Sequence, residues 1–300
     1  MTRVLVTGAS GFIGRHVLSH LDERHHEIHA VSRRPPATQG AGVTWHAADL
    51  LAPGQAAALA AGIGADVLVH LAWEATPGRF WRAAANVDWV AASLQLFRAF
   101  AAAGGTRAVL AGTCAEYDWR AARLCEQETQ LRPATLYGKA KAATFTLLDD
   151  IAVDLGVELV WGRVFFLYGP HEASGRLVPD VIDALMLGQG VDCTDGLQAR
   201  DFMHVDDVAR AFVMLTHASY RGPINVASGI CRPVRAVVEE IAGQLGHPDL
   251  VRFGARPSPP DDPEKLEADT RQLRELGFAP QFDLAAGIAD TIHWRKAHRT

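Results

Sequence analysis

Near its beginning the chain reads Val4-Leu5-Val6-Thr7-Gly8-Ala9-Ser10-Gly11-Phe12-Ile13-Gly14, a short apolar run followed by a glycine-rich loop. The apolar run predicts a buried strand, and the residues from Arg15 onward predict a helix. Glycines at these spacings permit a tight turn, a close approach of the backbone to a pyrophosphate, and close packing of helix on strand. The N-terminus of the helix would then face the phosphate charge. Because strand, loop and helix occur together, the stretch predicts a dinucleotide site rather than an ordinary turn. Its expected cofactor contacts are Gly8, Ser10, Gly11, Phe12, Ile13 and Gly14.

Short apolar runs alternate with helical patterns through the first half of the chain. We expect strands at Val4–Val6, Ile28–Val31, Val43–His46, Val67–Leu71, Ala108–Ala111 and Leu159–Val164. Their continuous Val and Leu content is typical of strands buried on both faces of a parallel sheet. Long helices are expected at Phe80–Ala103 and Tyr137–Leu155. This alternation predicts an α/β fold with a Rossmann-type, doubly wound parallel sheet.

After about residue 168 the pattern changes, and Gly169-Pro170 interrupts the chain. The second half predicts a smaller mixed α/β C-terminal lobe, with a loop that runs to Asp201 and a strand at Ile224–Val226. Its helices are expected at Leu177–Leu187, Val205–Thr216, Arg232–Leu245, Thr270–Leu276 and Leu284–Ala297. We therefore expect residues 1–168, with about 203–228, to form the cofactor domain. Residues 169–202 and 229–300 would form the substrate-binding lobe.

Composition limits the class of protein. Hydrophobic residues make up 49% of the chain and charged residues 21%, which is enough apolar content for a sizeable core. The net charge of −5 argues against a nucleic-acid partner. No apolar stretch approaches the roughly 20 residues that span a bilayer. The cysteines form no CxxC pair, so neither a metal site nor a disulfide framework is expected. Because the N-terminus enters a strand directly, we expect no signal peptide and a cytoplasmic location.

The end of the second predicted strand bears on cofactor choice. It reads Val31-Ser32-Arg33-Arg34, where NAD-specific sites commonly carry an acid that binds the ribose hydroxyls. The stretch contains no acid, and the arginines can pair with a 2′-phosphate, so NADP is favoured and NAD is the alternative. Arg34 also fits a solvated surface position. Further cofactor contacts are expected after the third and fourth strands, at Asp49, Leu50, Leu71, Ala72 and Trp73.

Tyr137 and Lys141 are four residues apart in a predicted helix, so their side chains share one face. An ammonium group beside a phenol favours the phenolate and lowers its pKa from about 10. Such a phenol can donate a proton to a carbonyl oxygen or accept one from an alcohol. Thr113 follows the strand at Ala108–Ala111, at the edge where doubly wound sheets place active-site groups. These residues predict a nicotinamide-dependent oxidoreductase with Thr113, Tyr137 and Lys141 as its catalytic residues.

With these motifs the chain resembles the extended short-chain dehydrogenase/reductases, the NAD(P)-dependent epimerases, dehydratases and reductases of nucleotide sugars. The resemblance covers nearly the whole chain. It rests on Thr7–Gly14, Asp49-Leu50, His70-Leu71-Ala72, Asn86, Thr113 with Tyr117, Tyr137–Lys141, Tyr168-Gly169-Pro170 and Arg200–Asp207.

The resemblance implies roles for particular residues. Tyr137 would be the acid/base, Lys141 would also bind the nicotinamide ribose, and Thr113 would polarise the sugar carbonyl. Arg200 would contact the nucleotide diphosphate, and Arg256 is a second candidate for that role. The remaining expected contacts are Asn86 and Phe165 with the cofactor, and Cys114 and Arg176 with the nucleotide sugar. The family also implies a homodimer formed through helices Trp81–Ala103 and Tyr137–Leu155.

The stretch Thr113-Cys114-Ala115-Glu116 distinguishes among the reactions of the family. Dehydratases that resemble this chain have Thr-Asp-Glu at the strand end, so 4,6-dehydration is not expected. With NADPH favoured, the sequence predicts a reductase of a nucleotide-linked 4-keto-6-deoxyhexose, with a thymidine nucleotide suggested by analogy. The alternatives are an NAD-dependent nucleotide-sugar epimerase and, more distantly, a non-catalytic NADP sensor. One departure concerns Phe166 in Arg163-Val164-Phe165-Phe166, where many relatives have an asparagine that contacts the nucleotide diphosphate.

Overall fold

The computed structural model describes residues 1–37 and 42–298. It consists of two compact units, each built from separate stretches of the chain. Unit 1 contains Met1–Asp118, Gln130–Val164 and Ala209–Ile224, and unit 2 contains Trp119–Thr129, Phe165–Val208 and the chain from Asn225 onward. The expectation that the second half binds the substrate stays a prediction.

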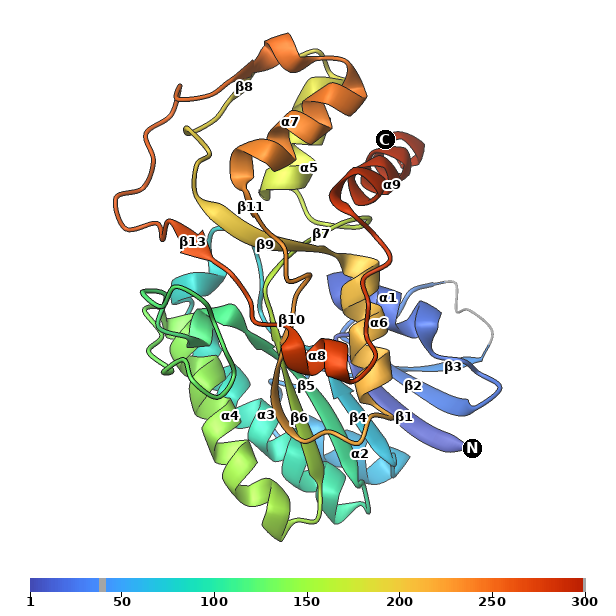
Figure 1. The fold of residues 1–300 in the computed structure, drawn as a ribbon. Coiled ribbons are helices and arrows are strands. Elements are labelled where there is room, and N and C mark those ends of the chain that lie inside the picture. The colour runs from blue at the N-terminus through green and yellow to red at the C-terminus, as the bar shows by residue number, and fades with distance from the viewer. Residues whose placement is uncertain (38–41, 299–300) are drawn as a thin grey trace. The chain divides into compact units, whose positions relative to one another are not determined.

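Unit 1 is built on a seven-stranded sheet of order β10-β6-β5-β4-β1-β2-β3 (Figure 1). The strands are β1 (Thr2–Thr7), β2 (His26–Ser32), β3 (Val43–Ala47), β4 (Val67–His70), β5 (Arg107–Thr113), β6 (Glu158–Val164) and β10 (Gly222–Val226). Strands β1 to β6 pair in parallel, so the predicted Rossmann-type sheet and its first six strands are confirmed. The chain runs outward from β1 to β3 and returns to β4 on the other side of β1. The ends of β1 and β4 therefore flank the switch point where such sheets bind ligands.

The helices of unit 1 are α1 (Phe12–His20), α2 (Gln55–Ile63), α3 (Ala85–Ala102) and α4 (Leu136–Asp154). Figure 1 shows α3 and α4 side by side against the sheet. Apolar side chains of the strands and of these helices form one buried core, which includes Leu5, Leu68, Leu110, Leu96, Phe97, Leu148 and Trp161. Burial of these side chains is the main stabilising contribution to the unit.

The expected helix at Phe80–Ala103 is partly wrong. Residues Phe80–Arg82 form a short 3-10 turn (η1), Ala83 is extended, and α3 begins at Ala85. The side-chain amide of Asn86 donates to the carbonyl oxygens of Phe80 and Ala83, at 2.7 and 2.9 Å. A local bond from an asparagine to the backbone competes with the helix in this way.

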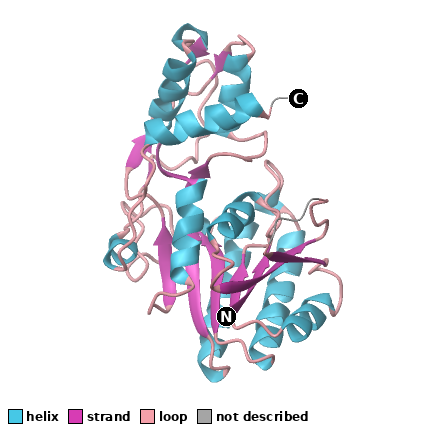
Figure 2. Ribbon diagram, turned by 90° about the vertical axis from the view of Figure 1, so that its right-hand side faces the viewer, coloured by secondary structure: helices cyan, strands magenta, loops and turns pink. Residues whose placement is uncertain are grey.

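Unit 2 is a smaller mixture of helices and short strands (Figure 2). Strand β9 (Ala199–His204) pairs with β7 (Phe166–Tyr168), β11 (Cys231–Pro233) and β13 (Lys265–Leu266). A further pair joins β8 (Val191–Asp192) and β12 (Val251–Arg252). Helices α5 (Leu177–Met186), α7 (Val234–Leu245) and α9 (Leu284–Ala297) enclose a second core, whose members include Ile182, Leu185, Val238, Ile241 and Ile288. Unit 2 also contains η3 (Pro248–Leu250) and α8 (Arg271–Glu275). Helix α6 (Val205–Leu215) is divided between the units, because Val205–Val208 belongs to unit 2 and Ala209–Leu215 to unit 1. The loop predicted up to Asp201 is wrong, because β9 begins at Ala199.

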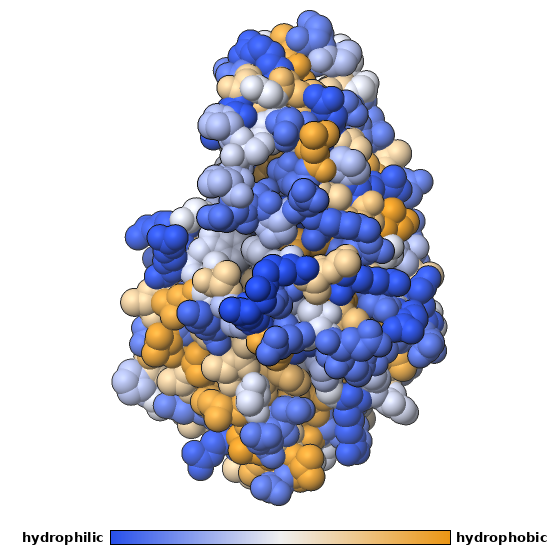
Figure 3. Space-filling model, turned by 60° about the vertical axis from the view of Figure 1, so that its left-hand side comes forward, coloured by the Kyte–Doolittle hydropathy of each residue, from blue (hydrophilic) through white to orange (hydrophobic). Residues whose placement is uncertain are grey.

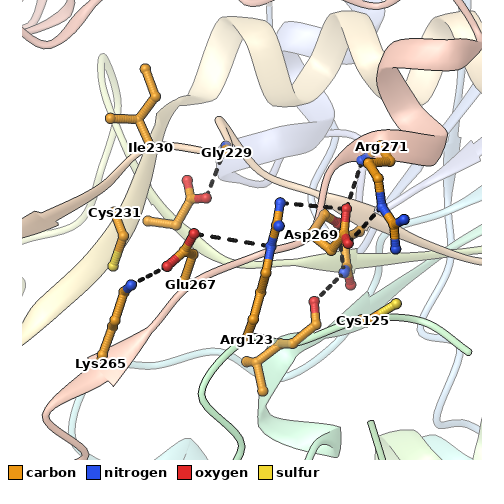
Figure 4. Close-up of polar contacts among 12 residues, drawn as sticks. Arg123, Cys125, Gly229, Ile230, Cys231, Lys265, Glu267, Asp269 and Arg271 are labelled. Carbon is orange, nitrogen blue, oxygen red and sulfur yellow. Dashed lines mark hydrogen bonds and ion pairs between the residues drawn. The ribbon is translucent and has the colours of Figure 1, made fainter. Parts of the chain in front are cut away.

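An ion-pair network explains why residues 119–129 belong to unit 2 (Figure 4). The Arg123 guanidinium lies between Glu267 and Asp269, with nitrogen–oxygen distances of 4.0 and 3.6 Å. Lys265 pairs with Glu267, and Arg271 pairs with Asp269. Backbone hydrogen bonds join the same two segments. The Leu124 amide donates to the Glu267 carbonyl oxygen at 2.8 Å, and the Asp269 amide donates to the Leu124 carbonyl oxygen at 2.9 Å. Partly exposed ion pairs each contribute little to stability. The backbone hydrogen bonds are therefore the stronger link between residues 119–129 and the rest of unit 2.

Candidate functional site

The glycine loop lies at the end of β1, packed against the end of β4. Gly8 has φ 68°, and a Cβ added there would lie 2.7 Å from the amide nitrogen of Ala72. A Cβ added at Gly14 would lie 2.2 Å from the Gly8 carbonyl oxygen. Helix α1 starts at Phe12, and its N-cap residue is Gly11, which has no side chain to satisfy the first amides. These residues therefore fit a cradle for a cofactor pyrophosphate, whose charge the amides of Phe12 and Ile13 would meet.

Two side chains hold this loop to its surroundings. The hydroxyl groups of Ser10 and Ser32 are hydrogen-bonded at 2.8 Å, which joins the loop to the end of β2. The Arg15 guanidinium donates to the carbonyl oxygens of Ser10 and Gly11, at 2.8 and 3.3 Å. Sequence reasoning missed Arg15, although an arginine in the first turn after the loop was a visible signal.

The residues expected to select the cofactor lie at the ends of β2 and β3. Arg33 and Arg34 are exposed just after β2. Hydrogen bonds from Thr76, with a smaller contribution from the charge of Arg33, lower the pKa of Glu74. Asp49 is exposed and its carboxylate accepts from the Leu51 amide at 3.1 Å, whereas Leu50 is buried. The preference for NADP over NAD stays a prediction.

Helix α4 brings Tyr137 and Lys141 to the end of β5. The side chain of Thr135 caps the helix by accepting from the Gly138 amide at 3.1 Å. Lys141 is 4% exposed, and its ammonium donates to the Ala111 carbonyl oxygen at 2.7 Å. The same ammonium lies 3.8 Å from the ring centroid of Trp73, a cation–π contact. Burial lowers the pKa of Lys141 to about 7, and the negative charge of Glu116 opposes this shift.

Aromatic rings surround the Tyr137 ring. Phe80, Trp81 and Trp73 contact it edge to face, with centroids 4.9, 5.7 and 6.4 Å away. The Trp73 indole nitrogen donates to the Asn86 side-chain oxygen at 2.9 Å, and Asn86 is fully buried. Asn86 thus positions Trp73 and the η1 turn, while its predicted contact with the cofactor stays a prediction. Sequence reasoning missed Phe80 and Trp81, which the aromatic-rich stretch after the fourth strand could have indicated.

Thr113 ends β5 and caps the short 3-10 helix η2 (Cys114–Glu116). Its hydroxyl oxygen accepts from the Ala115 amide at 3.2 Å, and its own amide donates to the Glu116 carboxylate at 2.8 Å. This reciprocal arrangement is a capping box, a pattern that Thr-x-x-Glu favours. Cys114, predicted to contact substrate, is buried in η2.

The other predicted substrate contacts belong to unit 2. Arg200 is buried, and its guanidinium donates to the carbonyl oxygens of Ala199 and Pro263 and to the Asp262 carboxylate. Arg256 is exposed, and its backbone amide donates to Cys193 O at 3.0 Å. Arg176 is the N-cap residue of α5. Phe165, predicted to contact the cofactor, is a buried residue of unit 2.

Beside Arg176, Glu172 gives a prediction about stability. Burial raises its pKa to about 8 although the charges of Arg176 and Arg295 oppose the shift, and its Oε2 atom is buried with no hydrogen-bond partner among the described residues. A raised folded pKa means that the stabilising protonated form is fully present below about pH 4.5 and is lost as pH rises towards 8. We therefore expect the free energy of unfolding of the Glu172→Gln variant to increase relative to that of the wild type as pH rises from 5 to 8, by about 3 kcal/mol at most. Thermal unfolding at several pH values measures this, and parallel curves for the two proteins would contradict it.

Two further properties concern the residues 1–37 and 42–298. In this part of the chain no group of three or more His, Cys, Asp or Glu side chains is arranged to hold a metal ion. None of its helices combines the length and apolar character that crossing a membrane requires.

Comparisons with known proteins identify the family of this chain. A model of the NAD dependent epimerase/dehydratase family matches residues 4–227. A dTDP-glucose 4,6-dehydratase of Streptomyces griseus is 31% identical over 182 residues, which cover 58% of this chain and 54% of that protein. The chain thus spans about half the length of that relative.

Two other similar proteins are matched over nearly their whole lengths. A probable UDP-glucuronate 4-epimerase of Rhizobium meliloti is 26% identical over an alignment of 355 positions that covers 99% of each protein. The solved structure of MoeE5 in complex with UDP-glucuronic acid and NAD is 29% identical, covers 98% of this chain and 99% of its own, and has a TM-score of 0.83. The resemblance expected from the motifs is confirmed: this chain belongs to the NAD-dependent epimerase/dehydratase family.

Proposed function

We propose that this chain is an NAD(P)-dependent enzyme that moves hydride at C4 of a nucleotide-linked sugar, and that its net reaction is NADPH-dependent reduction of a 4-keto-6-deoxyhexose. The observation that carries the proposal is the placement of Lys141, Tyr137 and Thr113 around the end of β5, in the unit that also holds the glycine cradle. Family membership supports the nucleotide-sugar class of substrate.

The residues of this chain would act on the sugar oxygen. Tyr137 donates a proton to the oxygen at C4 as negative charge develops there. The Thr113 hydroxyl already accepts a bond from the Ala115 amide, so its own proton is available to donate to the same oxygen. Lys141 supplies positive charge where water is excluded, which strengthens its effect on the transition state. When bound, the nicotinamide cofactor supplies the hydride.

Dehydration is not part of the proposal. The acid-bearing positions after Thr113 carry Cys114 and Ala115, and both are buried. Glu116 is fully buried and accepts from Arg163 at 2.8 Å, so it is engaged away from any substrate. The similarity to a protein named as a dehydratase therefore does not imply dehydratase activity for this chain.

Epimerisation at C4 is the second candidate, favoured by the similarity to a probable 4-epimerase along the whole chain. Both reactions use the same proton transfer at the C4 oxygen. They differ in whether the cofactor is consumed, so a single pair of measurements separates them.

The test is NADPH oxidation followed by absorbance, with thymidine-diphospho-4-keto-6-deoxyglucose and its 3,5-epimer offered separately. Consumption with one sugar would establish a C4 reductase and identify its series. Isomerisation of a nucleotide sugar by NMR, without net oxidation, would instead assign an epimerase. No reaction across a panel of nucleotide sugars would contradict both.

Arg33 gives a prediction about cofactor choice. If it binds the 2′-phosphate, the Arg33→Ala variant loses a charge-assisted hydrogen bond of about 1.5–3 kcal/mol. We expect the KM for NADPH to rise about 10- to 100-fold, with little change for NADH. Steady-state kinetics with both cofactors measures this, and Arg24→Ala, at an exposed arginine before the other end of β2, is the matched control. An equal effect of Arg33→Ala on the two cofactors would remove the argument for NADP.

We also retain the expected homodimer as a proposal. Val87 on α3 and Leu147 and Val153 on α4 are exposed apolar residues. Figure 3, which brings this side of the molecule forward, shows apolar side chains among hydrophilic ones in its lower part. Light scattering in solution would measure the oligomeric state.

A further inference from the structure

Glu116 and Arg163 form a buried ion pair next to Thr113, the predicted catalytic threonine. The Glu116 carboxylate and the Arg163 guanidinium are 0% and 1% exposed, and Arg163 Nε donates to Glu116 Oε2 at 2.8 Å. The Trp161 indole nitrogen donates to both carboxylate oxygens, at 3.0 and 3.1 Å. Arg163 also donates to the Tyr117 hydroxyl at 3.1 Å. Arg163 and Trp161 come from β6, whereas Glu116 directly follows β5.

Glu116 also contacts the backbone of the predicted catalytic threonine. Its Oε1 atom accepts from the backbone amide of Thr113 at 2.8 Å. Each carboxylate oxygen therefore accepts on its own side, Oε1 from Thr113 and Oε2 from Arg163. Only a carboxylate can do this, because an amide in the same place would turn a donor towards one of the two.

We propose that Glu116, held by Arg163, is a positioning residue that fixes Thr113 at the end of β5 and sets a negative charge facing Lys141. The inference rests on the proposed function, because it assumes that Thr113 and Lys141 act on the substrate. Glu116 itself is 0% exposed, so in this proposal it acts without touching the substrate. It acts on the backbone that carries the Thr113 hydroxyl and on the charge of Lys141.

The charges around Lys141 support the second half of the proposal. The Lys141 ammonium lies 5.9 Å from the ring centroid of Trp161, whose indole nitrogen donates to both Glu116 oxygens. Burial is the main cause that lowers the pKa of Lys141, and the charge of Glu116 opposes this shift. The other titratable groups near Lys141 are His70 on β4, whose pKa is lowered by burial and to a smaller extent by the Lys141 charge, and Tyr137 on α4 itself. Arg163 on β6 is already paired with Glu116. Glu116 is therefore the one of these groups whose negative charge favours a charged Lys141.

The test uses Glu116→Gln, with Glu158→Gln as the matched control. Glu158 pairs with the buried Arg107 at 2.8 Å, at the start of the same two strands, so its loss also deprives a buried arginine of a carboxylate partner. A purely structural role for Glu116 predicts that the two variants differ from the wild type only in stability. Should Glu116→Gln fail to fold, the double variant Glu116→Gln, Arg163→Met removes the unpaired charge as well.

The first readout needs no substrate. The chain has only four lysines, Lys139, Lys141, Lys265 and Lys296, so protein labelled in its lysine side chains gives few NMR signals to assign. We expect the pKa of Lys141 to fall by about half a unit or more in Glu116→Gln and to stay unchanged in Glu158→Gln. An unchanged Lys141 titration in Glu116→Gln would overturn this half of the proposal, whatever the enzyme does with sugars.

The second readout uses whichever nucleotide sugar the wild type turns over. Displacement of Thr113 should lower kcat about 10- to 100-fold in Glu116→Gln, with little change in KM. In a double-mutant cycle with Thr113→Ala, the two losses should be much less than additive, because both act through the same hydroxyl. Additive losses would overturn the positioning role, whereas inactivity of the wild type on every sugar would count against the proposed function alone.

Discussion

Replacing Tyr137 with phenylalanine should lower kcat about 10²- to 10⁴-fold, the range that a positioned acid/base contributes. The substitution removes only the phenolic hydroxyl, and the ring keeps its edge-to-face contacts with Phe80, Trp81 and Trp73. Stability and cofactor binding should therefore remain close to those of the wild type. Turnover is measured as NADPH oxidation, and cofactor binding as the change in NADPH fluorescence.

Tyr220→Phe is the matched control for this variant. The Tyr220 hydroxyl donates to the Pro223 carbonyl oxygen at 2.6 Å, in the same unit but in the segment that leads to β10. Its loss should affect stability and leave turnover unchanged. If Tyr137→Phe kept its activity, Tyr137 would not be the acid/base, and the proposed mechanism would fail with it.

The fold of unit 1 was predictable because its signals are local. Most strands of the central sheet contain an apolar run of neighbouring residues, and the glycine loop follows β1 directly. The short strands of unit 2 lack such a signal. Strand β13 has two residues, and it exists because it pairs with β9, more than 60 residues earlier in the chain. Sequence reasoning could not find that pairing.

In the candidate site, too, local features were predictable from the sequence and contacts between distant segments were not. Tyr137, Lys141 and Thr113 were predicted from spacing and strand ends, and the structure places them around the end of β5. The Thr-x-x-Glu sequence also predicts the capping box that the structure shows at Thr113 and Glu116. The partner of Glu116, by contrast, depends on the register of β5 and β6, which sets Gly112 opposite Arg163. No local sequence pattern predicts the ion pair between Glu116 and Arg163, although this ion pair determines the role that we propose for Glu116.

The Lys141→Met variant should lose activity and yet gain stability at low pH. Removing the positive charge from the site should lower kcat about 10²- to 10³-fold. The stability effect follows from burial, which holds the pKa of Lys141 at about 7 in the folded chain, below its value in the unfolded chain. Stability that depends on neutral Lys141 is present above about pH 10 and is lost as pH falls towards 7.

Two opposing free-energy terms determine whether Lys141→Met is more or less stable than the wild type at each pH. At pH 6 the buried ammonium costs the wild type about 4 kcal/mol, whereas the variant leaves the Ala111 carbonyl without its donor at a cost of about 1–3 kcal/mol. The variant should therefore unfold at a higher temperature than the wild type at pH 6, and at a lower one near pH 10. Lys139→Met, on an exposed residue of the same helix, should change neither activity nor the pH dependence. Thermal unfolding across this pH range measures the crossover, and a constant difference between variant and wild type would mean that Lys141 is not a destabilised buried cation.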